Sequence, residues 1–269
     1  MKKLSFILLF ISLISFGQST IETKFNPPEG YERVISSPYH KWVINQKIIL
    51  DEPVYYHTGY IKPGLNETYI AKFDYKIGTR DLHQCADATI YLHAKYNWDT
   101  NQTDRIKYYF TNGMLYSYED YLKGFRPIVN GNESKLVRRN DEALYENNLT
   151  NLRKYLTIIW SYAGTLSLAK YETDFVGWNG PFPGDMFLYG GNPGHVVNVV
   201  DIIEKGGRKY PGNERKFILS QSWMPAQEHE ILLNPKDNSV WFDRQDIYRY
   251  LGFDQHDLKR FKINDNPKP

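Results

Sequence analysis

The sequence predicts a single α+β domain in which an antiparallel sheet packs against a helix that begins at Cys85. Residues 85–98 carry apolar side chains at helical spacing, on one stripe with the cysteine. Residues 196–203 and 216–222 are rich in β-branched and apolar side chains, and two glycines between them permit the turn of an antiparallel hairpin. No internal repeat, low-complexity tract or linker is visible, so we expect residues 18–269 to form one domain.

Residues 1–17 have the composition of a signal peptide. Two lysines precede an uncharged apolar stretch, 4–16, that is too short to stay in a bilayer as a spanning helix. Ser15 and Gly17 supply the small side chains of a cleavage site, which makes Gln18 the expected new N-terminus. We therefore expect an exported protein, periplasmic or secreted, with no stable membrane insertion after cleavage.

The charge of the mature chain is balanced. Removing the two leader lysines from 33 basic residues leaves 31, against 31 acidic residues. Such a chain has no long-range attraction for nucleic acid or for an anionic membrane, so neither is an expected partner. Aromatic residues make up 16% of the sequence, which suits either a groove for peptide or sugar or half-buried strand positions; composition does not choose between them.

Cys85 is the one cysteine of the chain, so it can form no internal disulfide. An unpaired thiol in an exported protein is either buried and inert or retained for its chemistry. Residues 81–84 have the pattern of a capping box, an acidic residue with glutamine three positions later, which puts Cys85 in the first helical turn. Helix-start N–H groups and the dipole favour a thiolate with a lowered pKa, as a nucleophile needs. The alternative is a small core residue beside Ala86 and Ala88.

A thiolate nucleophile also needs a base, and His195 is the best placed of the seven histidines. It follows the glycine-rich loop 190–194 and opens an apolar strand, so it lies at the edge of a buried sheet. The alternative is a half-exposed histidine that only ends a strand. His83 points away from the cysteine on a helical wheel, and His93 lies about two turns along the helix. The other histidines have no comparable setting: His40, His57, His229 and His256.

A third polar group should orient the imidazole of His195. In an antiparallel hairpin, Gln221 near the end of the second strand returns to the end that carries this histidine. Asp201 shares the face of His195 but lies about 20 Å further along the strand, and Asn198 faces the other way. We therefore favour Gln221, although a buried glutamine equally serves to bond backbone groups.

Other kinds of site have little support in the sequence. No pair of histidines or cysteines has zinc-site spacing, and the HExxH pattern is absent. The glycine-rich loop 190–194 lacks the lysine that follows a phosphate-binding loop. We therefore expect neither a metal nor an organic cofactor.

Two short segments resemble the NlpC-like branch of the papain-fold peptidases. PGDMFL at 183–188 and GHVVNVV at 194–200 are similar to its glycine–aspartate strand and its histidine strand. In that branch the nucleophilic cysteine opens an earlier helix, as Cys85 does, and a third polar residue comes from the strand after the histidine, here 217–221. The resemblance implies a papain-like (NlpC-like) fold, a catalytic pair of Cys85 and His195, and cell-wall peptide as a possible substrate.

Three further segments resemble an uncharacterised family of exported bacterial proteins, known mainly as a domain of unknown function. These are DLHQCAD at 81–87, YAGTLS at 162–167 and SQSWMPAQ at 220–227, and the likeness spans most of the mature chain. The cysteine and the histidine are 110 positions apart, more than is usual in the NlpC-like branch. We expect residues 99–170 to form an insertion that covers or reshapes the cleft, with one long helix that ends near Lys170.

Taken together, these features predict a cysteine peptidase or amidase that hydrolyses or transfers an acyl group from an amide or ester. Cys85 forms a thioester, His195 is first the base and then the acid, and Gln221 orients it. The backbone N–H of Cys85 contributes to the oxyanion hole. The alternative is an inactive papain-shaped module that binds peptide or glycan through aromatic side chains. The substrate and the oligomeric state stay open.

Overall fold

The centre of the fold is the predicted antiparallel hairpin. β10 (His195–Lys205) pairs with β11 (Arg215–Gln221), and Asn198 lies opposite Ser220 in the register. Both strands are almost wholly buried, because helices and loops cover both faces of the sheet. Burial on two faces explains why these segments are continuous apolar runs rather than alternating ones.

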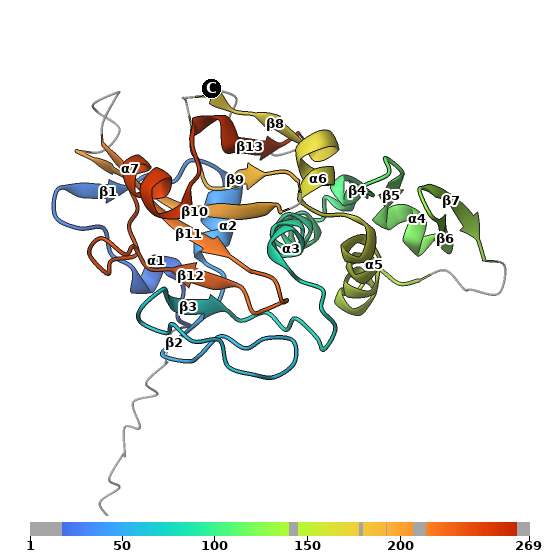
Figure 1. Cartoon of the computed structure of the whole chain (residues 1–269), viewed down its shortest axis with the longest axis horizontal. Helices are drawn as coiled ribbons and strands as arrows, with labels where there is room; N and C mark the ends of the chain where they lie inside the picture. Colours follow the sequence, from blue (N-terminus) through green and yellow to red (C-terminus); the bar gives the residue numbers. More distant parts are fainter. Residues whose placement is uncertain (1–17, 140–144, 178–179, 192, 207–213, 263–269) are drawn as a thin grey trace, which may run out of the picture.

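The hairpin lies in the middle of a larger sheet (Figure 1). In the described part of the chain the strand order is β2-β3-β12-β11-β10-β9-β13-β8, with β1 beside the far end of β10, and each adjacent pair is antiparallel. The remaining strands of this sheet are β1 (Tyr31–Arg33), β2 (Ile48–Leu50), β3 (Tyr69–Phe73), β8 (Thr173–Phe175), β9 (Asp185–Tyr189), β12 (Glu230–Leu232) and β13 (Leu258–Phe261). The prediction of an α+β fold with an antiparallel sheet is confirmed.

This computed structural model describes most of the chain. The described residues are 18–139, 145–177, 180–191, 193–206 and 214–262. The expected signal peptide, 1–17, lies outside them, as do the second glycine of the expected hairpin turn and the last residues of the expected domain. Within these ranges no helix has both the length and the apolar character needed to span a bilayer.

The helix α3 (Cys85–Asp99) is buried on nearly all sides. One side packs against β10, where Leu92 and Tyr96 join a core shared with the sheet and with α2 (Pro38–Ile44). The opposite side, which includes Ile90, faces a second core built by the insertion. A helix enclosed in this way has no polar face, so its apolar pattern is broader than the single stripe expected from the sequence.

Short helices surround the sheet and α3. Ser37 caps α2 and Pro38 occupies its first position, as helix-start preferences predict. The other α-helices are α1 (Ile21–Lys24), α4 (Tyr118–Leu122), α5 (Leu149–Tyr162), α6 (Thr165–Ser167) and α7 (Arg244–Asp246). Single-turn segments of other helical types are η1 (Thr103–Arg105), η2 (Leu168–Glu172), η5 (Ile247–Leu251) and η6 (Gln255–Asp257).

The insertion between α3 and the sheet is not mainly helical. It contains two hairpins, β4 (Lys107–Tyr109) with β5 (Leu115–Ser117) and β6 (Phe125–Asn130) with β7 (Glu133–Arg138). These lie beyond α3 and α5, away from the large sheet (Figure 1). Buried tyrosines join the first of these hairpins to α5, because the Tyr155 hydroxyl donates to the Tyr116 carbonyl at 2.7 Å.

The helix expected to run to about Lys170 ends earlier. α5 stops at Tyr162, since Ala163 has an extended conformation and Gly164 begins α6 in another direction. The change of direction returns the chain to the loop that precedes β10. At this end the Tyr162 carbonyl accepts the N–H of Thr111 at 2.8 Å, a contact that the sequence does not reveal.

Candidate active site

Cys85 is the first residue of α3, as predicted, but the cap differs from the expected one. Gln84 is the N-cap, and the Asp87 carboxylate accepts the backbone N–H groups of His83 and Gln84, each at 3.0 Å. Asp81, the expected cap, instead accepts the N–H of Ala226 at 2.7 Å. Acidic residues at both positions satisfy a capping pattern, so spacing alone does not separate them.

His195 is the first residue of β10, and it is joined to the end of β11. Its Nε2 lies 2.8 Å from Oε1 of Gln221. Asn198 pairs with Ser220, so Gln221, the next residue of β11, comes alongside the start of β10. Because side chains alternate along a strand, Gln221 lies on the face that carries His195 and not on the face that carries Asn198. The hairpin therefore brings together the two side chains that strand alternation predicts; their catalytic roles stay a prediction.

Asp201, which the sequence analysis set aside, belongs to a different buried cluster. Its carboxylate accepts a hydrogen bond from Arg33 Nε at 2.8 Å and lies 2.8 Å from His40 Nε2. All three side chains are buried or nearly so. Asn198 also bonds elsewhere, to the Ser220 carbonyl at 3.4 Å. Neither residue orients His195.

Cys85 and His195 line one cavity of about 580 Å³. Its walls come from the α3 start, the end of α5, the loop before β10 and the loop after β11; they include Leu82, Trp160, Thr165, Gly194, Trp223 and Met224. The backbone N–H of Val196, the residue after the histidine, acts on the Cys85 thiol and tends to lower its pKa. Among the described residues no hydrogen bond links Sγ to the imidazole, so the Sγ–nitrogen distance that catalysis requires stays a prediction.

The environment favours the neutral forms of both groups. Burial raises the pKa of the Cys85 thiol, although the N–H groups of Val196, Ala86 and Cys85 act in the opposite direction. Burial lowers the pKa of His195, and the hydrogen bond to Gln221 partly offsets this. The lowered thiol pKa expected from the helix start is therefore wrong for this state, because desolvation outweighs the helix terminus.

Two aromatic rings that the sequence analysis missed enclose the imidazole of His195. The Trp223 ring lies 3.9 Å from it, centroid to centroid, and is 46% exposed. Phe253 is stacked at 6.1 Å. Trp223 could have been found, since it lies two residues after Gln221 and so on the same face of an extended chain. Phe253 could not, because only the tertiary fold brings it here.

A charged pair beyond Gln221 was also missed. The Gln221 Nε2 donates to Oε1 of Glu230 at 2.9 Å, and Oε2 of Glu230 is paired with Lys62. The Glu230 side chain is completely buried. Its strand, β12, pairs with β11 so that Gln221 and Glu230 are directly opposite. No sequence pattern links these positions.

The glycine-rich loop before His195 is shaped by α6. A Cβ on Gly194 would lie 2.1 Å from Thr165 Oγ1 and 2.6 Å from the Gly191 carbonyl oxygen, and one on Gly190 would lie 2.4 Å from Ala169 Cβ. These glycines permit the close approach of the two segments. Thr165, which belongs to the expected insertion, thus forms part of the cavity wall.

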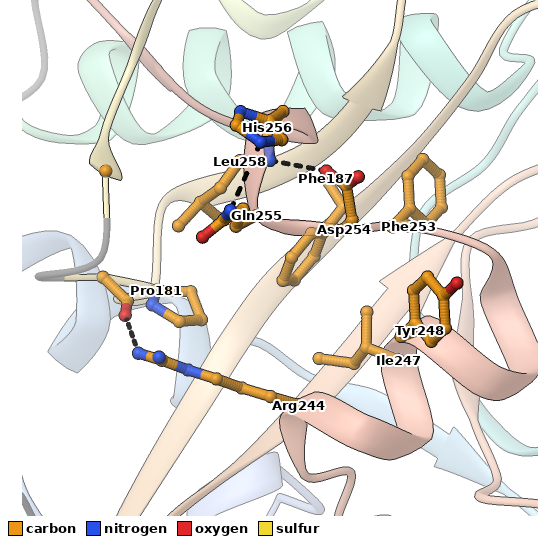
Figure 2. A pocket seen from close by; sticks show the side chains of 12 residues that line it. Pro181, Phe187, Arg244, Ile247, Tyr248, Phe253, Asp254, Gln255, His256 and Leu258 are labelled. Carbon is orange, nitrogen blue, oxygen red and sulfur yellow. Dashed lines mark hydrogen bonds between the residues drawn. The ribbon is translucent and has the colours of Figure 1, made fainter.

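Figure 2 shows a second pocket, lined by segments around β9, α7 and β13. It has a volume of about 280 Å³ and is mostly apolar, with Phe187, Ile247, Phe253 and Leu258 among its lining residues. Arg244 lies at its edge and donates to the Gly180 carbonyl at 2.6 Å. Phe253 separates this pocket from the imidazole of His195, and no cysteine lines it. We therefore place the chemistry in the larger cavity.

Other buried polar residues do not form a metal centre. Over the described ranges, no three His, Cys, Asp or Glu side chains converge in a way that could hold an ion. Asp185 of the expected glycine–aspartate strand is occupied structurally, because it accepts hydrogen bonds from Arg260 and from the N–H of Phe182. It holds the strand next to β10 in place rather than facing Cys85.

Comparison with known families places most of the chain in one family. A family model described as a domain of unknown function (DUF4846) matches residues 21–262. The chain belongs to this family. The DUF4846 region spans Cys85, His195 and Gln221 together with the insertion, and it confirms the expected membership in a family of unknown function. No curated protein and no solved structure matches the chain.

Proposed function

We propose that this DUF4846 protein is an exported, papain-like cysteine hydrolase or acyltransferase that acts on an amide or ester bond. The observation that carries the proposal is the hydrogen bond between His195 and Gln221 at the wall of the cavity that contains Cys85. A thiol, an imidazole and an orienting amide in one cavity are the groups that nucleophilic acyl transfer needs.

The arrangement of elements supports a papain-like fold of the NlpC-like kind. A helix with cysteine at its first position packs against an antiparallel sheet. The histidine opens a central strand, and the orienting residue ends the next one. The chain order is cysteine, histidine, third polar residue, as in that branch of the papain-fold peptidases.

The reaction begins with neutral partners. Nδ1 of His195 takes the thiol proton while Sγ of Cys85 attacks the carbonyl carbon of the substrate. Backbone N–H groups at the start of α3, that of Cys85 among them, stabilise the oxyanion. The imidazolium then protonates the departing amine or alcohol, and a thioester on Cys85 is left. Water, or an acceptor amine in transfer, attacks the thioester carbonyl while His195 takes its proton. The C–S bond then breaks, the carboxylic acid or the new amide is released, and the leaving thiolate takes the proton from the imidazolium.

The cavity is suited to an extended peptide rather than a compact cofactor. Its lining comes from the start of α3, the end of α5 and the loops beside β10 and β11, and Trp160, Trp223 and Met224 give it apolar walls beside polar groups. Cell-wall peptide is the substrate that the resemblance favours. Export after cleavage before Gln18 would bring the enzyme to that substrate, and mass spectrometry of the periplasmic or secreted protein tests this by its N-terminal mass.

Reaction with an electrophile tests the nucleophile directly. Native mature protein treated with iodoacetamide should gain one adduct on Cys85, while His195→Ala should react more slowly near neutral pH. Because burial raises the thiol pKa, the rate should climb with pH through a midpoint above the ordinary value of about 8.5. Screening wall-derived peptides with Cys85→Ser as the control then identifies the bond. A Cys85 that reacts only after denaturation would mark it as a core residue.

A binding module is the second candidate, because exposed apolar residues surround the cavity. Met224 is 64% exposed and Tyr189 is 59% exposed, beside the half-exposed Trp223. In that case the protein should bind peptide or glycan equally well with Cys85→Ala, and no turnover should accompany binding. Isothermal titration together with product analysis separates the two candidates.

A further inference from the structure

We propose that Glu230, fixed by Lys62, is a positioning residue that sets the proton of His195 on Nε2 and leaves Nδ1 free as the base. The inference rests on the proposed function for its use but not for its chemistry. Its core is a chain of side chains across three neighbouring strands, His195 on β10, Gln221 on β11 and Glu230 on β12.

Only one orientation of the Gln221 amide satisfies this chain. A carboxylate accepts hydrogen bonds and donates none, so the NH₂ group of Gln221 must face Glu230, as it does at 2.9 Å. The amide oxygen is then left to face His195, 2.8 Å from Nε2. An oxygen acceptor requires a proton on that nitrogen. The neutral imidazole carries one proton, so Nδ1 keeps a lone pair.

The burial of Glu230 points to a positioning role. Its side chain is 0% exposed, and a buried carboxylate is costly unless it is paired and bonded. Lys62, 16% exposed, satisfies the second carboxylate oxygen, while the first is used by Gln221. Both oxygens are therefore committed, and neither the acceptor character of Glu230 nor the direction of the chain depends on solvent.

Without the carboxylate the amide would be free to turn over. If the NH₂ group of Gln221 faced His195, Nε2 would have to accept, and the proton would move to Nδ1. An imidazole in that tautomer cannot take a proton from Cys85 through Nδ1. The charge on Glu230 therefore prevents a state that has the same shape as the active one.

Glu230→Gln is the decisive variant. The Lys62 ammonium can only donate, so the new amide should turn its oxygen to Lys62 and its NH₂ to Gln221. Gln221 then presents its own oxygen to residue 230 and its NH₂ to His195. Adding Lys62→Met removes the ammonium and lets the amide at 230 rotate, so part of the original orientation should return.

The readout is the tautomer itself, measured by ¹H–¹⁵N NMR of the His195 ring in the mature protein with Cys85→Ala. The unsubstituted relay should show the Nε2–H tautomer, Glu230→Gln should lose it, and the double variant should recover part of it. In protein that retains Cys85, Glu230→Gln should slow turnover about tenfold or more.

Glu228→Gln is the matched control. Glu228 lies in the same segment and is likewise paired with a lysine, Lys72 at 2.6 Å, but it makes no bond to Gln221. It should leave the His195 tautomer unchanged. Lys62→Met alone leaves the buried Glu230 without its counter-charge, so it should weaken the preference for the Nε2–H tautomer, which retains a test if Glu230→Gln does not fold.

The outcomes separate this inference from the proposed function. An Nδ1–H tautomer in the unsubstituted protein, or an unchanged tautomer in folded Glu230→Gln, overturns the positioning role. If the His195 tautomers follow the expected pattern but Cys85 is unreactive, the positioning role of Glu230 is supported and the proposed hydrolase function is contradicted. A tautomer change in Glu228→Gln of the same size overturns the assignment to Glu230.

Discussion

Two histidine sites next to this sheet, one fully buried and one half-buried, differ in how their ring nitrogens are used. His40 has both nitrogens occupied, since Nε2 lies 2.8 Å from Asp201 and Nδ1 accepts the N–H of Ser36 at 3.1 Å. His195 bonds only through Nε2, and its Nδ1 has no hydrogen-bond partner among the described residues. A saturated imidazole holds a structure together, whereas one with a free nitrogen beside a cavity can move a proton.

The partners differ in the same sense. Asp201 brings a full charge to the first site, fully buried and shared with Arg33. Gln221 brings a neutral amide to the second, and the charge of Glu230 acts one residue further away. Burial lowers the pKa of His195, and the hydrogen bond to the neutral Gln221 amide offsets this only in part. Burial alone therefore does not mark a catalytic histidine.

The largest expected effect is on chemistry at the second site. His195→Ala should reduce turnover by about 10³-fold, because general base catalysis contributes about 10²–10⁴-fold. The free energy of unfolding should change little, since the ring is only half-buried. Steady-state kinetics and denaturant unfolding on the same preparation check both halves. If the exposed control His256→Ala lost as much activity, the loss in His195→Ala would not indicate a catalytic role.

The first site should respond in the opposite way. His40→Ala should lower the free energy of unfolding by about 3 kcal/mol, because it removes one partner from a buried charged cluster. At a temperature where the variant is folded, its turnover should stay within about twofold of that of the unsubstituted protein. A change of this size is well below the tenfold that about 1.4 kcal/mol of activation free energy would produce. A large loss of activity in fully folded protein would contradict a purely structural role for His40.

A smaller effect is expected where the insertion meets the histidine loop. Gly194→Ala places a methyl group 2.1 Å from Thr165 Oγ1, so α6 or the loop must move, at a cost of about 1–3 kcal/mol. Turnover should fall as well, because the moved loop carries His195. Gly164→Ala is the control, since a Cβ there meets nothing within 4 Å. Thermal unfolding and kinetics of the two variants should differ clearly.

The smallest effect concerns the cover over the imidazole. Trp223→Ala admits water to the bond between His195 and Gln221, which is worth about 1 kcal/mol, so turnover should fall about fivefold. Stability should change little for a side chain that is 46% exposed. Tyr60→Ala, at a 76% exposed aromatic residue away from the site, is the control. If the two variants behave alike, Trp223 does not shield the imidazole.

Much of the core arrangement was readable from local pattern. β-branched runs and a glycine turn predicted the central hairpin, and side-chain alternation brought Gln221 to His195. A helix beginning at Cys85 was likewise predicted, although its cap was assigned three residues too early. These features depend on neighbours in the chain or on a single strand pairing, which periodicity specifies.

The surroundings of His195 and Gln221 depend on the tertiary structure. Glu230 contacts Gln221 from a third strand, and Lys62 pairs with Glu230 from a distant loop. Phe253 reaches His195 from near the end of the chain. The end of α5 and the raised pKa of the Cys85 thiol follow from close packing and from burial. Burial and contact between remote segments are sums over the whole fold, so residue type and spacing within one segment cannot determine them.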